Sequence, residues 1–308
     1  MLTVMSDQTE SRRQRAARRA GEFPSPPEPL PRTVIDSHTH LDITVAEAGV
    51  TGGPAGAGDP FAAGSGDPVA AMIEVAAGVG VDRLVQVGVD VASSRWGAEV
   101  ARQHRAVVAT VALHPNEAPR LADLDEALRQ IEALAAEERV RGIGETGMDF
   151  FRTGDEGRAA QELSFRAHIA IAKRYGKPLV IHDRDAHADV LRVLDEEGAP
   201  QTVVLHCFSG DAEFATECLR RGYVLSFAGT VTFASAHALR AAARITPLDQ
   251  LLVETDAPYL TPTPHRGRPN GSYLIPLTVR SLAETTGADL TELCTAISAT
   301  GERVFGPW

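Results

Sequence analysis

The sequence predicts an α/β fold of the (β/α)₈ class, the TIM barrel. Eight short apolar runs alternate with longer amphipathic segments from residue 33 onward, which is the pattern of repeated βα units. The length of 308 residues suits one barrel with short appendages better than two complete domains. An open, doubly wound sheet is the rival, but a glycine-rich loop usually follows its first strand. Here HTHLD follows instead.

The predicted strands are short and rich in valine, leucine and isoleucine. In chain order they span residues 33–36, 83–88, 107–112, 140–144, 178–181, 202–205, 223–227 and 251–254. Between them, apolar residues recur three and four positions apart, which predicts helices, most clearly over 121–138 and 158–175. Two further helices are expected over 274–285 and 290–304. Because 44% of the residues are hydrophobic but only 5% are aromatic, aliphatic side chains must fill the core.

Two segments lie outside this pattern. Residues 11–20 carry five arginines and precede a proline-rich stretch at 22–31. No apolar core follows the arginines, as an export signal would require, so residues 1–32 are expected to form a disordered tail, with weak contact to phosphate groups left open. Residues 33–308 then form the barrel. Within them, 49–68 are rich in Gly, Ala and Pro without periodicity, which favours an inserted surface loop over a lid on the catalytic face.

Composition excludes several classes of protein. No apolar run approaches the roughly 20 residues that span a bilayer. Cys207, Cys218 and Cys294 are too few and too scattered for a disulfide framework, which favours reduced thiols in a cytoplasmic protein. The net charge of −11 argues against a broad basic surface that coats nucleic acid. A polyanionic substrate would therefore have to be met locally, by bound cations and a few arginines.

Imidazole and carboxylate side chains follow six of the predicted strands. They are His38 and His40 after the first strand, His114 after the third, Glu145 after the fourth, His182 after the fifth, His206 after the sixth and Asp256 after the eighth. In a barrel these strand ends converge on one face, so the side chains are expected to surround one cavity. Such groups are costly to desolvate unless they are paired or bind a metal.

Each of these residues alone has an ordinary structural explanation. Glu145 could cap the next helix, Asp256 could shape a turn, and His206 could be a hydrogen-bonded core histidine. Because the same residue types recur at equivalent positions of a repeating unit, one shared metal site explains them better. Four imidazoles and two carboxylates could hold two divalent cations if one carboxylate bridges, with Zn²⁺, Mn²⁺ and Mg²⁺ all open. Structural roles are favoured for the histidines in helical patterns, His104, His168, His187 and His237.

Five motifs carry a family resemblance. DSHTHLD, GETGMDF, IHDR, HCFSG and ETDAP occur in this order from residue 36 to 258, and PHRGRPN follows at 264–270. With them the chain resembles the TatD family of metal-dependent deoxyribonucleases, in the amidohydrolase superfamily. The resemblance covers everything except the N-terminal tail and the glycine-rich insertion. It implies a TIM-barrel hydrolase that cleaves phosphodiester bonds through a hydroxide activated by two divalent metal ions.

The resemblance also implies roles for the strand-end residues. One metal is held by His38, His40 and Asp256, the second by His182 and His206, and Glu145 bridges both. Asp256 is in addition the expected general base, and His114, in the LHP motif, the expected phosphate ligand or proton donor. The family often has a second histidine two positions after this one, where the chain has Asn116. The chain therefore lacks that second imidazole.

The two lysines of the chain support the same branch of the superfamily. Many related amidohydrolases bridge their metals with a carbamylated lysine at the end of the fourth strand. Lys173 lies in a helical pattern and Lys177 precedes the fifth predicted strand, so neither can serve. Glu145 occupies the place that a bridging group needs.

Further residues are candidates for binding substrate. Arginine guanidinium groups can bind phosphate oxygens in pairs, and an aromatic ring can stack on a base. The candidates are Arg184, Phe208, Ser209, His265, Arg266 and Arg268, the last three in the PHRGRPN loop, for which a solvated basic turn is the alternative.

The favoured function is hydrolysis of DNA from single-stranded ends. A phosphatase or a deacylase acting on aminoacyl-tRNA could use the same site, since an ester and a phosphodiester both suit a metal-activated nucleophile. A non-catalytic scaffold is disfavoured because all six ligand positions are intact. The expected partner is single-stranded DNA and not a membrane. The oligomeric state is left open, and a monomer is compatible with the sequence.

Overall fold

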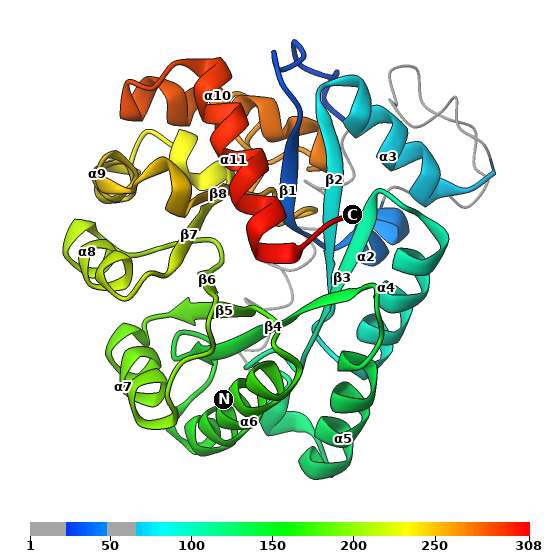
Figure 1. Cartoon of the computed structure of the whole chain (residues 1–308), viewed down its shortest axis with the longest axis vertical. Coiled ribbons are helices and arrows are strands. Elements are labelled where there is room, and N and C mark those ends of the chain that lie inside the picture. Colours follow the sequence, from blue (N-terminus) through cyan, green and yellow to red (C-terminus); the bar gives the residue numbers. More distant parts are fainter. Residues whose placement is uncertain (1–22, 48–65) are drawn as a thin grey trace, which may run out of the picture.

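The computed structural model describes residues 23–47 and 66–308. Eight parallel strands lie in the order β1 to β8, each beside its neighbour in the sequence, and they curve into a nearly closed barrel with helices around it (Figure 1). The predicted fold class is therefore confirmed. The strands are β1 (Val34–Thr39), β2 (Val81–Val87), β3 (Val107–Val111), β4 (Val140–Asp149), β5 (Leu179–Arg184), β6 (Val203–Leu205), β7 (Val224–Phe227) and β8 (Leu251–Val253).

Every predicted strand overlaps an observed one, but β1, β4 and β5 extend further than expected. β1 runs to Thr39 and so includes His38. β4 and β5 extend as far as Asp149 and Arg184, which pair across the strands. Glu145 and His182 therefore also lie within strands rather than after them. A position inside a hydrogen-bonded strand restricts the backbone, which holds both side chains in fixed directions.

Helices cover the outside of the barrel and connect its strands. They are α2 (Leu41–Glu47), α3 (Pro68–Gly78), α4 (Val91–Gln103), α5 (Leu124–Ala135), α6 (Asp155–Tyr175), α7 (His187–Glu197), α8 (Ala212–Arg220), α9 (His237–Ile245), α10 (Ile275–Thr286) and α11 (Leu290–Phe305). In residues 23–47 and 66–308, none has the length and apolar character of a bilayer-spanning segment.

Aspartates fix the starts of several of these helices. The side chains of five N-cap aspartates accept hydrogen bonds from the first-turn amides, which have no partner within the helix. These residues are Asp67, Asp90, Asp123, Asp211 and Asp289. Each cap ends a connecting loop at a defined residue, so the loops leave the strands in defined directions.

Bonds beyond the end of β8 join it to β1. Thr39 bridges to Ala257 in parallel fashion, and the His40 amide donates to the Ala257 carbonyl at 2.9 Å. The Asp256 amide donates to the His38 carbonyl, also at 2.9 Å. The backbone bonds that join the first and last strands are thus made at the residues predicted to bind metal.

A segment at residues 23–31, here called the N-terminal strap, packs against the barrel. The Leu30 side chain is 8% exposed and belongs to the core, and its amide donates to the Val79 carbonyl at 3.0 Å. Tyr273 donates its hydroxyl to the Pro24 carbonyl at 2.8 Å. The expectation of a disordered tail is therefore wrong for residues 23–32, where apolar burial and backbone bonds fix the chain. Residues 1–22, and the predicted insertion up to residue 65, lie outside the described residues.

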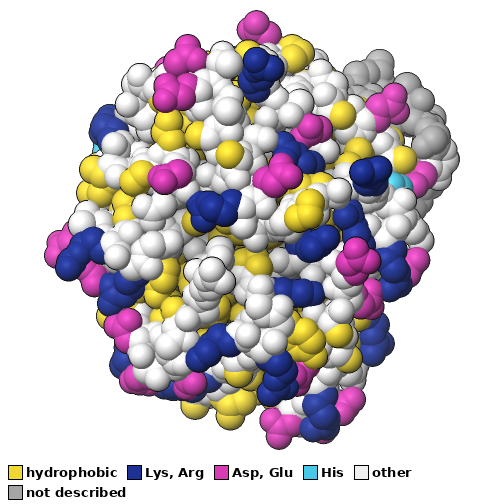
Figure 2. All heavy atoms as spheres, in the orientation of Figure 1, with side chains coloured by type: hydrophobic (Ala, Val, Ile, Leu, Met, Phe, Trp, Pro, Cys, Tyr) yellow, Lys and Arg dark blue, Asp and Glu magenta, His cyan; other side chains and the backbone are white. Residues whose placement is uncertain are grey.

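Charges of both signs are interspersed on the face of the molecule drawn in Figure 2. No broad basic patch appears on that face, in keeping with the net charge of −11. Many arginines lie in short ion pairs within or between helices, such as Arg166 and Arg192 with Glu162. Exposed pairs of this kind contribute little stability each, and they leave few arginines available to bind an anion.

His168, in α6, is a structural histidine, as the sequence predicts. Its side chain is buried; Nε2 accepts the Leu113 amide at 3.0 Å and Nδ1 donates to the Ser164 carbonyl at 2.7 Å. Burial lowers its pKa from 6.5 to about 4. Because Leu113 directly precedes His114, this neutral imidazole also anchors the loop that carries a site residue.

We expect a His168→Gln variant to lose part of the acid sensitivity of the fold. The unfolded chain takes up a proton on His168 near pH 6.5 but the folded chain only near pH 4. This contribution is therefore complete above pH 6.5 and is lost as the pH falls toward 4, by roughly 3 kcal/mol. Urea unfolding of chelator-treated wild type and variant, at about pH 7 and about pH 5, measures the difference. If the free energy of unfolding changed equally between the two pH values in both proteins, this role of His168 would be contradicted.

Candidate metal centre

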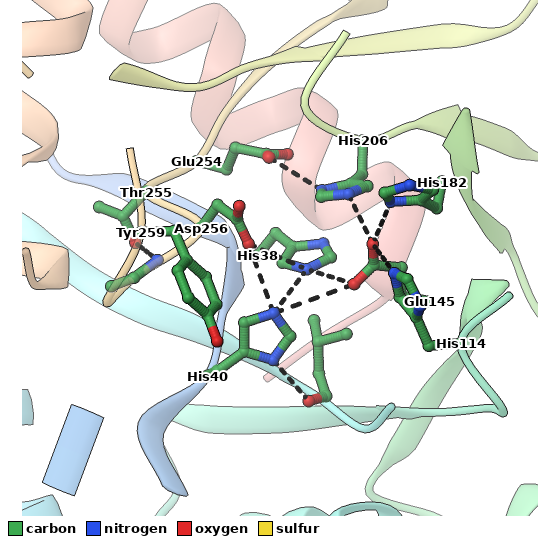
Figure 3. Close-up of polar contacts among 12 residues, drawn as sticks. His38, His40, His114, Glu145, His182, His206, Glu254, Thr255, Asp256 and Tyr259 are labelled. Atoms are coloured by element: carbon green, nitrogen blue, oxygen red, sulfur yellow. Dashed lines mark hydrogen bonds and ion pairs between the residues drawn. The ribbon is translucent and has the colours of Figure 1, made fainter. Parts of the chain in front are cut away.

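The predicted strand-end residues meet in one place. Figure 3 shows imidazole and carboxylate side chains directed toward one another at the C-terminal ends of the strands. They belong to His38, His40, His114, Glu145, His182, His206 and Asp256. The Glu145 side chain lies at the centre and is 5% exposed.

One oxygen of Glu145 faces the residues of β1. Its Oε2 lies 3.4 Å from His38 Nε2 and 3.9 Å from His40 Nε2. Asp256 Oδ1 lies 3.4 Å from the same nitrogen of His40 and 3.8 Å from that of His38. The ligand atoms of His38, His40 and Glu145 are close enough together to hold one cation.

The other oxygen of Glu145 faces a second group of imidazoles. Its Oε1 lies 2.6 Å from His182 Nδ1, 2.9 Å from His206 Nε2 and 3.3 Å from His114 Nε2. One carboxylate therefore connects two clusters, one at each oxygen. Burial alone would raise the pKa of Glu145, but His206 and His114 hold it well below the usual range. The carboxyl group is consequently ionised.

The hydrogen bonds behind three imidazoles point their free nitrogens into the site. His40 Nδ1 lies 3.1 Å from the Val87 carbonyl, and His206 Nδ1 lies 3.0 Å from Glu254 Oε1. Because each partner accepts a proton, it can hold the ring proton on Nδ1 when a cation binds at Nε2, whereas without a cation Glu145 and Glu254 raise the pKa of His206 well above its usual value. The Nε2 atom then presents a lone pair to the centre, as a metal ligand must.

His182 follows the same rule with its nitrogens exchanged. Its Nε2 lies 3.3 Å from Asp149 Oδ2, and its Nδ1 faces Glu145. Asp149 also accepts from the Asn116 side chain at 2.9 Å. The supporting acceptors Asp149 and Glu254 are absent from the residues predicted as a site. A sequence signal was present for Glu254, because it stands two positions before Asp256 and an extended chain puts both on the same side.

The ring of His114 is held by a hydrogen-bond donor instead of an acceptor. Its Nδ1 accepts the backbone amide of Asn116 at 3.0 Å, so in the neutral ring Nε2 carries the proton. Burial lowers the pKa of His114, which favours that neutral form. A protonated Nε2 cannot bind a cation, although this atom is near enough to Glu145 and His182 for metal binding by distance alone. The hydrogen bond therefore makes His114 a donor toward the centre.

The set of donor atoms fits divalent cations. The Nε2 atoms of His38 and His40 lie 3.4 Å apart, and burial lowers the pKa of His38, so its imidazole is neutral. Oxygens of Glu145 and Asp256 lie within 4 Å of these two nitrogens, so nitrogen and oxygen donors converge on one place. Nitrogen and carboxylate oxygen together suit Zn²⁺ and Mn²⁺, and the carboxylates also suit Mg²⁺.

Neither lysine reaches this centre. Lys173 Nζ donates to the Glu197 carbonyl at 2.7 Å, and Lys177 Nζ donates to the carbonyls of Ala135 and Glu137. Lys177 stands two residues before β5, at the N-terminal end of the barrel. Glu145, by contrast, lies between the two clusters, with one oxygen facing each.

Phe208 is not placed for the role suggested by the sequence. Its ring is 2% exposed and stacks on Phe214 at a centroid distance of 5.6 Å. Cys207 has a φ of 41°, so the chain leaves the extended conformation directly after His206 and Phe208 turns into the core. The interpretation of Phe208 as a surface for a base is therefore wrong. Ser209 is exposed, and its hydroxyl donates to the Asp183 carbonyl at 3.2 Å.

The candidate arginines lie near aromatic rings or the strap. Arg184 Cζ is 3.8 Å from the ring centroid of Phe151, and Arg266 Cζ is 4.2 Å from that of Phe233. Neither guanidinium forms a salt bridge within the described ranges, so both keep donors for an anion. Arg268 donates to the Phe23 carbonyl of the N-terminal strap at 3.5 Å.

The rest of the PHRGRPN loop is held by its asparagine. The buried Asn270 amide donates to the Thr255 carbonyl at 3.0 Å and to the Tyr259 carbonyl. These bonds join the loop to the segment that carries Asp256. His265 is half-buried, and Arg268 lowers its pKa in addition to burial.

Comparison with known proteins identifies the family. The family model described as "TatD related DNase" matches residues 35–306. The chain belongs to the TatD family. A TatD protein of Mycobacterium tuberculosis, named an uncharacterized metal-dependent hydrolase, is 44% identical over 277 residues, 89% of this chain and 98% of that protein.

Two other relatives extend the comparison. A TatD protein of Cronobacter turicensis, named a 3′-5′ ssDNA/RNA exonuclease, is 36% identical over 241 residues, 76% of this chain and 90% of that protein. The crystal structure of the TatD homologue YJJV of Escherichia coli has a TM-score of 0.77 and 25% identity, and covers 89% of this chain and 98% of its own. This chain is thus a metal-dependent hydrolase of the TatD family.

Replacing Glu254 should weaken metal binding although Glu254 is not one of the proposed metal ligands. Loss of an acceptor behind a metal-binding imidazole typically costs 10–100-fold in affinity, so we expect about tenfold for Glu254→Gln and about 100-fold for Glu254→Ala. Competition between the protein and a fluorescent chelator measures this. Glu213→Gln, at an exposed glutamate of α8, is the matched control. Wild-type affinity in Glu254→Ala would remove Glu254 from the centre.

Proposed function

We propose that this protein hydrolyses the phosphodiester bonds of DNA, starting from a single-stranded end, with two divalent cations. The observation that carries the proposal is the placement of Glu145, whose two oxygens face separate histidine clusters. His38, His40 and Asp256 would hold one cation, His182 and His206 the other, with Glu145 shared. When bound, such a pair of cations polarises the phosphoryl group and acidifies a water molecule.

Asp256 is the carboxylate best placed to accept a proton. Its side chain is 15% exposed, whereas that of Glu145 is 5% exposed, so water reaches Asp256 more easily. Burial would raise the pKa of Asp256, but His40 and His38 lower it, which keeps the carboxylate ionised and able to accept.

His114 supplies the complementary donor. The Asn116 amide holds its proton on Nε2, where it can be donated to a phosphoryl oxygen or to the leaving oxygen. Asn116 thus orients the remaining imidazole, even though the chain lacks the second histidine expected at that position. Its own side chain donates to Asp149 and accepts the Thr153 hydroxyl at 2.9 Å, which fixes the loop on both sides.

A nucleic-acid end is the substrate that best suits this chain. The exonuclease name of one relative supports nucleic acid as the substrate class. With a net charge of −11, binding of a long duplex over a wide surface is disfavoured. Arg184 and Arg266 lack salt bridges in the described part of the chain, so a few phosphates can be bound locally.

Glu145→Ala should abolish metal-dependent shortening of an end-labelled single-stranded oligonucleotide while the barrel stays folded. The reason is that both clusters lose their shared carboxylate. Gel analysis of the products reports activity, circular dichroism reports folding, and Glu213→Ala is the control. Retained turnover in Glu145→Ala would contradict the two-metal proposal. If the wild type binds metal but leaves the oligonucleotide intact, the DNA substrate is wrong and aminoacyl-tRNA and small phosphoesters are tested next.

His114→Ala separates a proton donor from a metal ligand. We expect kcat to fall by about 10²–10⁴-fold, the usual contribution of a positioned acid or base, with metal stoichiometry and affinity unchanged. His182→Ala, by comparison, should lose bound metal. Elemental analysis of the purified proteins and single-turnover kinetics distinguish the two variants. A reduced metal content in His114→Ala would show that this histidine is a ligand.

A further inference from the structure

An exposed aromatic ring lies on the loop that follows β4, next to the metal centre. Phe151 is 64% exposed and is the most exposed large apolar side chain of the described residues. The next two, Leu163 at 51% and Ile245 at 44%, lie on α6 and α9. Phe151 instead stands two residues after Asp149, which contacts His182 at 3.3 Å.

The backbone beneath this ring is held firmly. Asp149 Oδ1 accepts the amides of Phe151 at 3.0 Å and Arg152 at 2.8 Å. The Phe150 amide donates to the Arg184 carbonyl at 2.9 Å. The carboxylate that supports His182 therefore also holds the loop, so the position of the ring is tied to the centre.

Arg184 covers part of the ring and carries the charge that a nucleotide requires. Its guanidinium carbon lies 3.8 Å from the ring centroid, which is a cation–π contact. Arg184 stands two residues after His182 and, within the described ranges, forms no salt bridge. A flat ring and an uncompensated guanidinium next to a phosphate-cleaving site match the two parts of a nucleotide, the base and the phosphate.

We propose that Phe151 is a stacking site for an unpaired nucleobase next to the scissile phosphate, with Arg184 binding a neighbouring phosphate. This inference rests on the function proposed above. The face of a base in a duplex is covered by its neighbours, so a ring on the rim selects single strands. Because every base has such a face, the site tolerates any sequence. Phe151 thus takes the role that Phe208, buried in the core, cannot perform.

The test combines a protein variant with a missing base. Wild type, Phe151→Ala and Phe151→Tyr are assayed on a single-stranded oligonucleotide and on a series in which an abasic residue replaces each of the terminal nucleotides in turn. Stacking on a side chain contributes about 5–150-fold per base, so Phe151→Ala should raise KM about tenfold and leave kcat within about twofold. Phe151→Tyr should resemble wild type. At one abasic position, wild type and Phe151→Ala should become equal.

A control and a binding measurement separate the possible failures. Leu163→Ala removes a similarly exposed apolar side chain away from the site and should change nothing. Fluorescence anisotropy of the labelled oligonucleotide with chelator-treated protein gives Kd without turnover. A Phe151-dependent Kd without cleavage by reconstituted wild type would overturn the nuclease proposal alone. An unchanged KM and Kd in Phe151→Ala, an equal loss on every abasic substrate, or no binding by wild type would overturn the stacking site.

Discussion

The arrangement of the C-terminal strand ends depends on the ionised carboxylate of Glu145. A charge in a buried position is stable only if partners surround it. Here the partners are imidazoles carried by β1, β5 and the ends of β3 and β6, all within 4 Å of one or other oxygen. The strand ends must therefore be held at fixed separations, which a closed barrel achieves better than an open sheet.

The closure of the barrel and the assembly of the centre depend on the same bonds. The amides and carbonyls of His38, His40, Asp256 and Ala257 connect β1 to the end of β8. Behind them, the buried carboxylate of Asp36 accepts the amide and the hydroxyl of Thr255. A change that separated β1 from the end of β8 would open the barrel and would also move His38 and His40 away from Asp256.

The histidines of the centre differ in the hydrogen-bond partner behind each ring, and no sequence motif specifies that partner. A carbonyl or carboxylate lies behind His40, His182 and His206, whereas a backbone amide lies behind His114. Since an acceptor can hold the ring proton away from the centre and a donor directs it toward the centre, the same side chain can serve two kinds of chemistry. Distances to Glu145 alone do not reveal this difference.

The strands and the strand-end residues could be predicted from the sequence because both depend on local periodicity. Apolar runs mark β1 to β8, and polar residues at their ends must meet once the sheet closes. Other features depend on contacts between distant residues. The pairing of Glu254 with His206 joins positions 48 residues apart, and the strap meets Tyr273 across 249 residues. The expected role of Phe208 as a surface for a base is wrong because the turn at Cys207 directs its ring into the core.

The scarcity of lysine has a practical consequence for attaching this protein to surfaces. Both lysines precede β5, at the end of the barrel away from the metal centre, and burial together with Arg141 lowers the pKa of Lys177 to about 8. Amine-reactive coupling can therefore form bonds only at the α-amino group and at these two positions. Molecules immobilised through the lysines would share one orientation, with the metal centre facing the solution.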